Sequence, residues 1–486
     1  MNYRMMGRLI GWILLAESLF MLPAVAICLY DGDTEVARAF LITIGVTAFA
    51  AGSLILIGRG AKKGFYAREG LVCVGISWLL LSLFGCLPFY ISRQIPSFIN
   101  ALFETVSGFT TTGSTILRDV EALTRGALYW RSFTHWLGGM GVLVFIMAVL
   151  PAGGRKGDSG SMVHLLRAES TGPQVDKLVS RMQDTAKILY VLYILLTVLC
   201  FGFLMAGGMS LFESLCTAFG TAGTGGFGVK NSSIADYSPY IQWVVTVFML
   251  LFGVNFGCYY LLLMRKIRTL LGDEELRTYI GIVAVSIGLV VWNLWDRFDS
   301  FGENLRHASF QVASIVTTTG FSTVDFNQWP SFSKAILLCL MLVGASAGST
   351  GGGFKVGRIL LLCKSFGRNL RQVLHPRRVQ VVRLSGRTVD EQVLAGTSLY
   401  FVTYIFLILL SFLLLSLDDF GTTTNFTAVV ACINNIGPGL DKVGPVGNFA
   451  DYSILSKLVL IFDMLAGRLE IFPVLVLFSR TTWSRK

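Results

Sequence analysis

The chain has 486 residues, of which 53% are hydrophobic and 14% are charged, and its mean hydropathy is +0.66. Soluble proteins usually carry about 25% charged residues, so this composition excludes a soluble globular protein and indicates a polytopic membrane protein. The formal net charge of +11 does not indicate a nucleic-acid partner, because the basic residues gather in loops between apolar runs, as in the cytoplasmic loops of membrane proteins.

Ten apolar runs are long enough to cross a bilayer, which requires roughly 20 residues. They cover residues 8–30, 38–58, 71–92, 128–151, 187–207, 239–264, 277–295, 334–362, 394–416 and 454–479. Shorter apolar stretches, predicted to be half-helices, lie between them at 98–109, 209–222, 305–316 and 422–433. Each half-helix leads into a short polar turn. After residue 70 the order span, half-helix, turn, span therefore occurs four times, and the first two spans stand outside the repeat.

Loop charge predicts the orientation of the spans. The loop 364–387 carries seven Lys and Arg residues and no acidic residue, and the loop 59–69 is also basic. Asp31 and Asp418 are among the acidic residues that mark the opposite side. The positive-inside rule then places both termini in the cytoplasm and lets all four turns enter from outside. We interpret the mixed loop 153–186 as a solvated connector, with a docking surface for a cytosolic partner as the alternative.

The four turns share a sequence pattern. They read TTTG at 110–113, TGGF at 224–227, TTTG at 317–320 and NIGP at 435–438. Glycine adopts backbone angles that other residues avoid, and irregular backbone at membrane depth is tolerated only where it is buried in protein or lines water. One such turn would be interpreted as an ordinary loop. Four at matching places predict the lining of a cation pore, in which carbonyl oxygens replace the water around an ion.

A second glycine-rich segment lies inside the predicted span 334–362. Residues 344–353 read GASAGSTGGG, and each glycine in a helix interior costs about 1 kcal/mol relative to alanine. We therefore expect a broken helix that borders a cavity or pore. The alternative is close packing of small residues between helices.

Several charged residues lie within apolar segments. Arg468 is in the last span, where a charge near the bilayer centre costs about 2.5–3.5 kcal/mol on insertion scales, so we expect it to face the pore. The alternative is an interfacial Arg468 paired with Glu470, and Asp463 is a second possible partner. Glu104 and Glu213, in two of the half-helices, either attract cations to the pore mouth or satisfy buried backbone amides, and the sequence favours neither.

The remaining polar residues show no catalytic pattern. No nucleophile and base, phosphate-binding loop or metal-ligand spacing links them, so we expect no enzyme. The nine cysteines show no paired spacing, which argues against a disulfide framework. The segment GGMG at 138–141 is interpreted as a site of close helix packing.

The repeat, and especially the segment NNIGPGL at 434–440, resembles the Trk/Ktr/HKT superfamily of potassium transporters. The two additional N-terminal spans and the chain length resemble its Trk-type membrane subunit, and the resemblance covers essentially the whole chain. It implies an all-α polytopic membrane protein with ten transmembrane helices. Four M1–P–M2 repeats with re-entrant pore loops would surround one pore, beside two extra N-terminal helices.

The resemblance also implies a K⁺ selectivity filter with one glycine in each repeat. By position, its residues are Thr111, Thr112, Gly113, Thr224, Gly225, Gly226, Thr318, Thr319, Gly320, Asn435, Ile436 and Gly437. In repeat 2, Gly223, Gly225 and Gly226 all compete for the filter position. We choose Gly226, because Gly226-Phe227 matches Gly320-Phe321. Within the family, serine in place of the first filter glycine accompanies sodium preference, so Gly113 favours potassium.

A gate beneath the filter is implied in the same way. It would consist of Gly348, Ser349, Thr350, Gly351, Gly352 and Gly353, with a pore-facing Arg468 in contact with them. Potassium is the expected substrate, and we expect no organic cofactor in this chain. A homodimer and a cytosolic nucleotide-binding Trk-type regulatory subunit are implied by the resemblance only. The expected location is the bacterial plasma (inner) membrane.

These expectations divide the chain into five parts. They are two N-terminal helices in 1–70, pore repeat 1 in 71–152, a cytoplasmic loop and pore repeat 2 in 153–264, pore repeat 3 with the gate loop in 265–362, and a basic loop with pore repeat 4 in 363–486. The leading hypothesis is potassium uptake through a gated, cation-selective pore regulated by a cytosolic partner. The alternatives are a symporter coupled to protons or sodium by alternating access and an assembly subunit without transport of its own. Repeats that all enter from one face favour the central pore.

Overall fold

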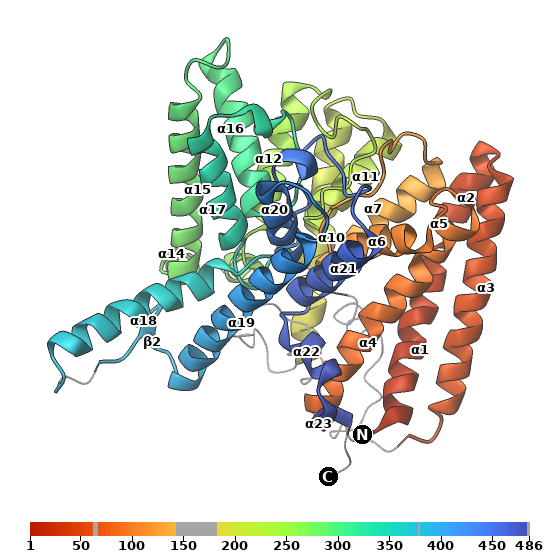
Figure 1. Ribbon diagram of the computed structural model, residues 1–486, viewed down its shortest axis with the longest axis horizontal. Coiled ribbons are helices and arrows are strands. Elements are labelled where there is room, and N and C mark those ends of the chain that lie inside the picture. Colours follow the sequence, from red (N-terminus) through yellow and green to blue (C-terminus); the bar gives the residue numbers. More distant parts are fainter. Residues whose placement is uncertain (62–66, 142–181, 378–379, 484–486) are drawn as a thin grey trace.

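The computed structural model describes residues 1–61, 67–141, 182–377 and 380–483. The regular secondary structure in this part of the chain is helical apart from one two-stranded hairpin. The N-terminal helices are α1 (Tyr3–Phe20), α2 (Leu22–Asp31) and α3 (Thr34–Ile57). They form a layer at one side of the molecule, in red at the right of Figure 1. The hairpin of β1 (Arg383–Leu384) and β2 (Arg387–Thr388) lies beside the long helix α18.

The rest of the chain forms four similar groups of helices. The first comprises α4 (Ala67–Gly85), α5 (Leu87–Ile91), α6 (Phe98–Phe109) and α7 (Arg125–Gly139), and the second α10 (Met182–Ala206), α11 (Leu211–Ala222), α12 (Pro239–Phe252) and α13 (Phe256–Leu263). The third comprises α14 (Ile267–Leu271), α15 (Glu274–Asn293), α16 (Phe301–Val316), η1 (Phe326–Gln328), α17 (Ser331–Val343) and α18 (Val356–Leu374). The fourth comprises α19 (Glu391–Leu415), α20 (Thr422–Ile433), η2 (Asp441–Val443), α21 (Ile454–Arg468), α22 (Phe472–Phe478) and α23 (Arg480–Trp483).

Local sequence fixes where many of these helices begin. Ser210, Ser238 and Ser300 precede α11, α12 and α16, and each side chain accepts a hydrogen bond from a backbone amide of the first turn. Asp273 and Asp390 do the same for α15 and α19. Because the first amides of a helix have no partner within it, such caps stabilise the start of a helix by about 0.5–2 kcal/mol.

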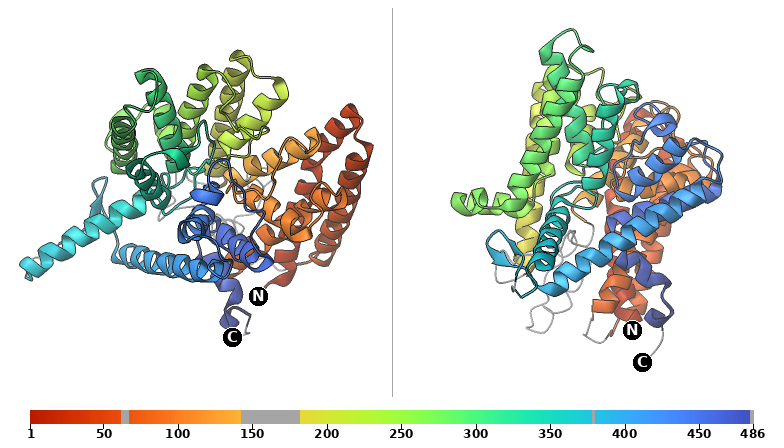
Figure 2. Two further views of the ribbon diagram at one scale, coloured as in Figure 1. Left: turned by 45° about the horizontal axis from the view of Figure 1, so that its top comes forward. Right: turned by 60° about the vertical axis from the view of Figure 1, so that its left-hand side comes forward.

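The four groups close into a ring. The short helices α6, α11, α16 and α20 point inward, and each packs against the helix that follows it in the chain. Between groups, α7 packs on α11, α12 on α16, α17 on α20, and α21 on α6. The ring is visible in the left view of Figure 2, where the colours follow one another around a centre. The ends of the four short helices therefore meet at one axis.

Six helical stretches in the described residues are long and apolar enough to cross a membrane, or seven if the bent pair α12 and α13 counts as one span. The uninterrupted run expected at 239–264 is wrong, because α12 and α13 meet at 89°. The run expected at 454–479 is also broken, between α21 and α22. The predicted span 334–362 breaks after Val343, inside the glycine-rich segment. Residues 142–151 of the span predicted at 128–151 lie outside the described residues, as does most of the loop 153–186.

These breaks have a common position in the groups. The helices α7, α12, α17 and α21 each follow one of the four turns, and each stops after 13 to 15 residues. Gly253 follows α12 and Gly344 follows α17. Glu470 and Ile471, just after α21, both adopt positive φ, which cannot continue a helix. The helices that follow the turns are therefore too short to form uninterrupted spans. Irregular backbone follows α12, α17 and α21 near the axis of the ring.

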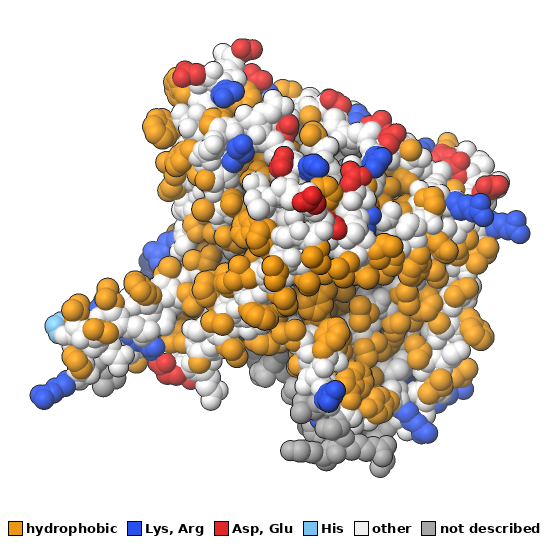
Figure 3. Space-filling model, in the orientation of Figure 1, with side chains coloured by type: hydrophobic (Ala, Val, Ile, Leu, Met, Phe, Trp, Pro, Cys, Tyr) orange, Lys and Arg blue, Asp and Glu red, His pale blue; other side chains and the backbone are white. Residues whose placement is uncertain are grey.

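The distribution of charged and hydrophobic side chains on the surface is that expected of a membrane protein. Figure 3 shows Asp, Glu, Lys and Arg side chains at the upper end and a broad hydrophobic band below them. The long helix α18 projects away from the ring (Figures 1 and 2) and carries exposed Phe366, Leu370, Val373 and Leu374. A hydrophobic belt of this kind is what lipid requires of a protein that crosses it.

Candidate functional site

The four turns begin where the inward-pointing helices end, and they share one backbone conformation. Their first shared residue has a φ of 53° to 58°, and the glycine two residues later has a φ of 78° to 101°. The members are Thr111 and Gly113, Thr224 and Gly226, Thr318 and Gly320, and Asn435 and Gly437. The residue between them is not left-handed in any of the four turns. This repeated alternation suits successive carbonyl groups that point to the same side.

The four glycines pack against one another in a closed ring. A Cβ atom on Gly113 would collide with the carbonyl oxygen of Gly225, one on Gly226 with that of Thr319, and one on Gly320 with that of Ile436. A Cβ on Gly437 would lie 2.8 Å from the carbonyl oxygen of Thr112, which returns to the first turn. Each contact joins one group to the next. The turns therefore surround a single axis, with no room for a side chain at the four glycine positions.

This geometry separates the three glycines that compete in the second turn. Gly226 has the positive φ and the neighbour contact of the other three glycines. Gly223 is the C-cap of α11, with a φ of −71°. Gly225 lies against the imidazole ring of His135, which a Cβ would overlap. The choice of Gly226 therefore agrees with the fourfold pattern, whereas Gly223 and Gly225 have other packing roles.

Side chains behind the turns hold the backbone in place. Thr110 and Thr317 share hydrogen bonds of 2.7 Å and 2.8 Å with the hydroxyls of Thr112 and Thr319. Asn435 Nδ2 donates to Thr112 Oγ1 at 3.0 Å and to the Met464 carbonyl at 2.9 Å. Because these groups bind one another, the hydroxyls of Thr112 and Thr319 help to fix the backbone of the first and third turns.

The two half-helix carboxylates have different surroundings. Glu104 is buried, accepts a hydrogen bond from the Ile116 amide at 2.9 Å, and forms an ion pair of 2.7 Å with Arg131. The guanidinium of Arg131 also lies 3.5 Å from the centre of the Phe227 ring, so it links the first turn to the second. For Glu104 the structure supports the alternative in which the carboxylate satisfies a buried amide. Glu213 is partly exposed at the start of α11, 3.5 Å from Lys230.

The glycine-rich segment runs directly beneath the turns. After α17 the chain is not helical again until Val356. The Gly352 amide donates to Thr318 Oγ1 at 2.6 Å, and a Cβ on Gly351 would lie 2.8 Å from the Thr317 carbonyl oxygen. A Cβ on Gly352 would collide with the Asn434 carbonyl oxygen. The predicted break in the helix is confirmed, and the segment touches both the third and the fourth turn.

The other residues of this segment tie it to the ring. Gly348 and Gly353 adopt positive φ, and Gly353 packs against Gly344. Ser349 Oγ donates to the Ser346 carbonyl at 2.6 Å, and Thr350 Oγ1 donates to the Phe252 carbonyl, at the end of α12, at 3.2 Å. The segment 344–353, which we call the plug, is thus ordered, and its glycines permit close approach to the turns.

Arg468 joins this segment to the first group. Its Nη1 donates to the Thr350 carbonyl at 2.8 Å, and its Nη2 donates to the carbonyls of Gly139, at 2.6 Å, and of Gly138. The two carboxylates considered as partners of Arg468 bind other residues. Glu470 forms an ion pair with Arg358, and Asp463 accepts a hydrogen bond from Ser411 at 2.8 Å. A guanidinium has five donors in a planar fork, which suits several backbone carbonyls at once.

Comparison with known proteins identifies the family. A family model described as TrkH, cation transport protein, matches residues 37–485. The chain belongs to the TrkH family. It is 38% identical to the Trk system potassium uptake protein TrkH of Salmonella typhimurium, over 99% of this chain and 100% of that protein, and 37% identical to the protein of the same name from Escherichia coli, with the same coverage. These relatives are transport proteins, in agreement with the expectation that the chain is not an enzyme.

A solved structure supports the same assignment. The fold matches the crystal structure of the potassium transporter TrkH from Vibrio parahaemolyticus with a TM-score of 0.87 and 32% sequence identity, covering all of both chains. The described arrangement of helices is therefore that of the TrkH family.

Several residues around the plug were not predicted from the sequence to contact it. Gly138 and Gly139 were interpreted as packing residues, but their carbonyls accept hydrogen bonds from Arg468. Lys355 is buried and its Nζ donates to the Gly351 carbonyl. Glu275 Oε1 accepts hydrogen bonds from the amides of Ala347, at 2.6 Å, and Gly357, at 3.1 Å. The available signal for Glu275 was the acidic run Asp273-Glu274-Glu275 just before a predicted span. Backbone acceptors leave no such signal in the sequence.

Proposed function

We propose that this protein takes up potassium across the bacterial inner membrane through a cation-selective pore. The observation that carries the proposal is the closed ring of four turns. Their backbone carbonyls would replace the hydration shell of an ion. The relatives named as potassium uptake proteins support potassium as the substrate. The filter would consist of residues 111–113, 224–226, 318–320 and 435–437.

The substitution Gly113→Ser tests the filter. A Cβ at this position collides with the Gly225 carbonyl, and the left-handed φ of 81° adds strain of about 1–3 kcal/mol for a residue other than glycine. We expect the ratio of potassium to sodium flux in proteoliposomes to fall about tenfold, as measured with potassium, rubidium, sodium and lithium in turn. Gly302→Ser is the matched control, because nothing lies within 4 Å of that Cβ. An unchanged ratio in a folded Gly113→Ser protein would refute the filter assignment.

We further propose that residues 348–353 and Arg468 form a gate beneath the filter. The contacts of Gly351 and Gly352 with the third and fourth turns support this proposal, because an ion leaving the filter would then meet the plug. The positive charge of Arg468 would repel a cation there, and its hydrogen bonds to Thr350 and Gly139 would hold the plug closed. Loss of these bonds would open the path.

Regulation from the cytoplasm is part of the same proposal. The relatives belong by name to a Trk system, and the loop 364–387 is strongly basic. We propose that both termini and this loop face the cytoplasm, where a nucleotide-binding subunit would act on α18 and thereby on the plug. The five-part division of the chain and a homodimer belong to the proposal as well.

One observation favours the symporter as a second candidate. Glu17, in α1, is buried, and neither of its carboxylate oxygens has a hydrogen-bond partner among the described residues. An ionisable side chain within a membrane span is rare and often marks a proton pathway. Proton binding at Glu17 would supply a coupling site. The two candidates differ in whether potassium flux depends on a proton gradient.

A further inference from the structure

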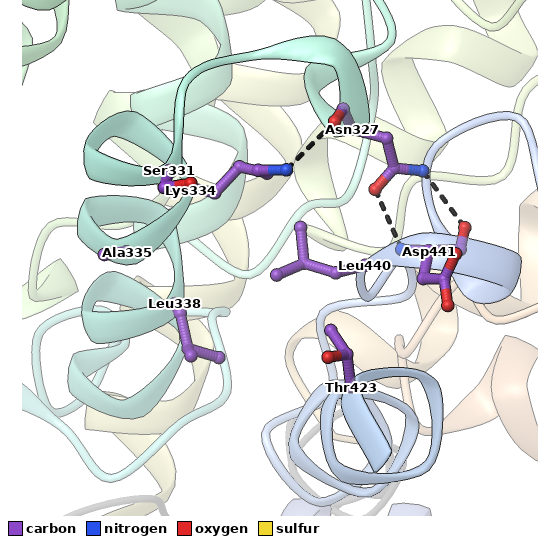
Figure 4. A pocket seen from close by; sticks show the side chains of 8 residues that line it. All are labelled: Asn327, Ser331, Lys334, Ala335, Leu338, Thr423, Leu440 and Asp441. Atoms are coloured by element: carbon purple, nitrogen blue, oxygen red, sulfur yellow. Dashed lines mark hydrogen bonds between the residues drawn. The ribbon is translucent and has the colours of Figure 1, made fainter. Parts of the chain in front are cut away.

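We propose that the cavity between α17 and η2 binds the headgroup of a zwitterionic phospholipid of the ethanolamine class. The cavity has a volume of about 460 Å³ and lies at the junction of the third and fourth groups (Figure 4). It is lined by Asn327, Ser331, Lys334, Ala335, Leu338, Thr423, Leu440 and Asp441. This inference does not depend on the proposed conduction mechanism.

The charges in the cavity indicate the chemistry of the ligand. Lys334 contributes an ammonium group and Asp441 a carboxylate, and neither forms an ion pair in the described part of the chain. Lys334 Nζ donates one hydrogen bond, to the Asn327 carbonyl at 3.2 Å, and has two further N–H groups. Two opposite, unpaired charges in one cavity match a ligand that carries a phosphate and an ammonium group.

The framework around these charges is well defined. Asn327 Oδ1 accepts from the Asp441 amide at 2.9 Å, and Asn327 Nδ2 donates to the Asp441 carbonyl at 3.0 Å. Thr424 Oγ1 donates to Asp441 Oδ2 at 2.7 Å, which leaves the other carboxylate oxygen available. These bonds join the segment before α17 to the segment after the fourth turn, as Figure 4 shows for Asn327 and Asp441.

The lining also has a polar end and an apolar end, which favours a lipid over a soluble ligand. Ser331 is at the start of α17, whereas Ala335 and Leu338 lie one and two turns further along the same helix. From Ser331 to Leu338 the helix rises about 10 Å. Phe332, on the first turn of the same helix, is 45% exposed. A headgroup held by Lys334 and Asp441 could therefore continue into an acyl chain alongside Ala335 and Leu338.

The bound lipid would touch the segment that leaves the fourth turn. Leu440 and Asp441 follow Gly437 closely, and the Leu440 amide is fixed to Thr427 Oγ1 at 2.9 Å. The contact between α17 and α20 is also the least extensive of the four between groups. A lipid here would fill the junction with the least extensive contact between helices and stabilise the fourth turn.

Two substitutions separate the roles of the two charges. Lys334→Gln removes the partner of the phosphate, so we expect it to weaken binding of both phosphatidylethanolamine and phosphatidylglycerol about tenfold. Asp441→Asn removes the partner of the ammonium group. It should weaken the binding of phosphatidylethanolamine by a similar factor and leave the binding of phosphatidylglycerol unchanged. Asparagine tolerates the left-handed backbone at this position, where φ is 60°. Lys442→Gln is the matched control, because Lys442 is the next residue, is exposed and does not line the cavity.

Native mass spectrometry of the full-length purified protein, titrated with each lipid, measures these affinities. The proposal predicts that Asp441→Asn loses affinity for phosphatidylethanolamine alone and that Lys334→Gln loses affinity for both lipids. Lys442→Gln should keep the affinities of the unmodified protein. Equal affinities in all four proteins would overturn it. Glycerophosphoethanolamine, which has the headgroup without acyl chains, is the competitor; displacement of the lipid at equal concentration would show that the cavity takes a soluble zwitterion and would overturn the lipid assignment.

Discussion

Glu104 and Glu213 occupy equivalent inward-pointing helices but differ in what their removal would expose. Without Glu104, the guanidinium of Arg131 would be a buried charge without its ion-pair partner. Breaking a buried ion pair by removing one partner typically costs about 3–5 kcal/mol. Glu213 and Lys230 are 25% and 34% exposed, and pairs near the surface usually contribute about 0–1 kcal/mol.

We therefore expect Glu104→Ala to lower the thermal unfolding midpoint clearly and Glu213→Ala to lower it much less. Unfolding of both purified variants in one detergent, followed by intrinsic fluorescence, makes the comparison. Similar midpoints for the two variants would show that Glu104 does not stabilise the first turn.

Arg468 presents a different case, because all three of its described acceptors are backbone carbonyls. Arg468→Ala removes both the positive charge beneath the turns and the bonds that hold the plug. Under the proposed gate, basal potassium flux into proteoliposomes without any partner should rise several-fold. Arg468→Lys keeps the charge but loses the planar fork of donors. Its potassium flux should therefore lie between that of the wild-type protein and that of Arg468→Ala. A folded Arg468→Ala protein with wild-type or lower flux would count against a closing role.

At the scale of elements, helix ends could be predicted where the sequence changes sharply from apolar to polar. The half-helices at 98–109 and 422–433 match α6 and α20 residue for residue, because a short apolar run ends abruptly at Thr or Asn. The break in 334–362 was also predicted, since its glycines cannot sustain a helix. The breaks after Phe252 and Arg468 were missed, because the polar residues beside them, Asn255, Arg468 and Glu470, still leave apolar runs long enough to span a membrane.

Two side chains anchor the plug to the surrounding helices: Arg468, in α21, and Glu275, in α15. Glu275, at the start of α15, accepts hydrogen bonds from the amides of Ala347 and Gly357. It therefore ties the plug and the start of α18 to one helix. Deletion within 348–353 should raise basal flux strongly, and Glu275→Ala should raise it less, because only one tether is lost. Glu274→Ala is the control, since Glu274 binds Lys364 and makes no described contact with the plug. Flux of ⁸⁶Rb⁺ into proteoliposomes measures all three, and an unchanged or lower flux in the folded deletion variant would contradict the gate.

At the scale of the whole molecule, the ring of four groups is closed but unequal. Three turns contain threonine at the first left-handed position and the fourth contains asparagine, and the junction between α17 and α20 is the least extensive. The sequence predicted the ring through its repeats, but not this inequality of junctions, which depends on packing between distant segments. An alternating-access cycle requires one part of the protein to move against another, whereas each turn here packs on the next around the full circle.

This closed packing leads to a prediction that separates the pore from the symporter. In a planar bilayer with a potassium gradient, a pore should pass current that reverses at the potassium equilibrium potential, whatever the pH difference across the membrane. The substitution Glu17→Gln should leave that reversal potential unchanged, because Glu17 lies in α1, outside the ring of turns. Thr47→Val, at a second buried polar site in the N-terminal layer, controls for the removal of a polar group from that layer. A reversal potential that shifts with the pH difference, and loses that shift only in Glu17→Gln, would instead establish proton coupling through the buried carboxyl group and replace the pore with the symporter.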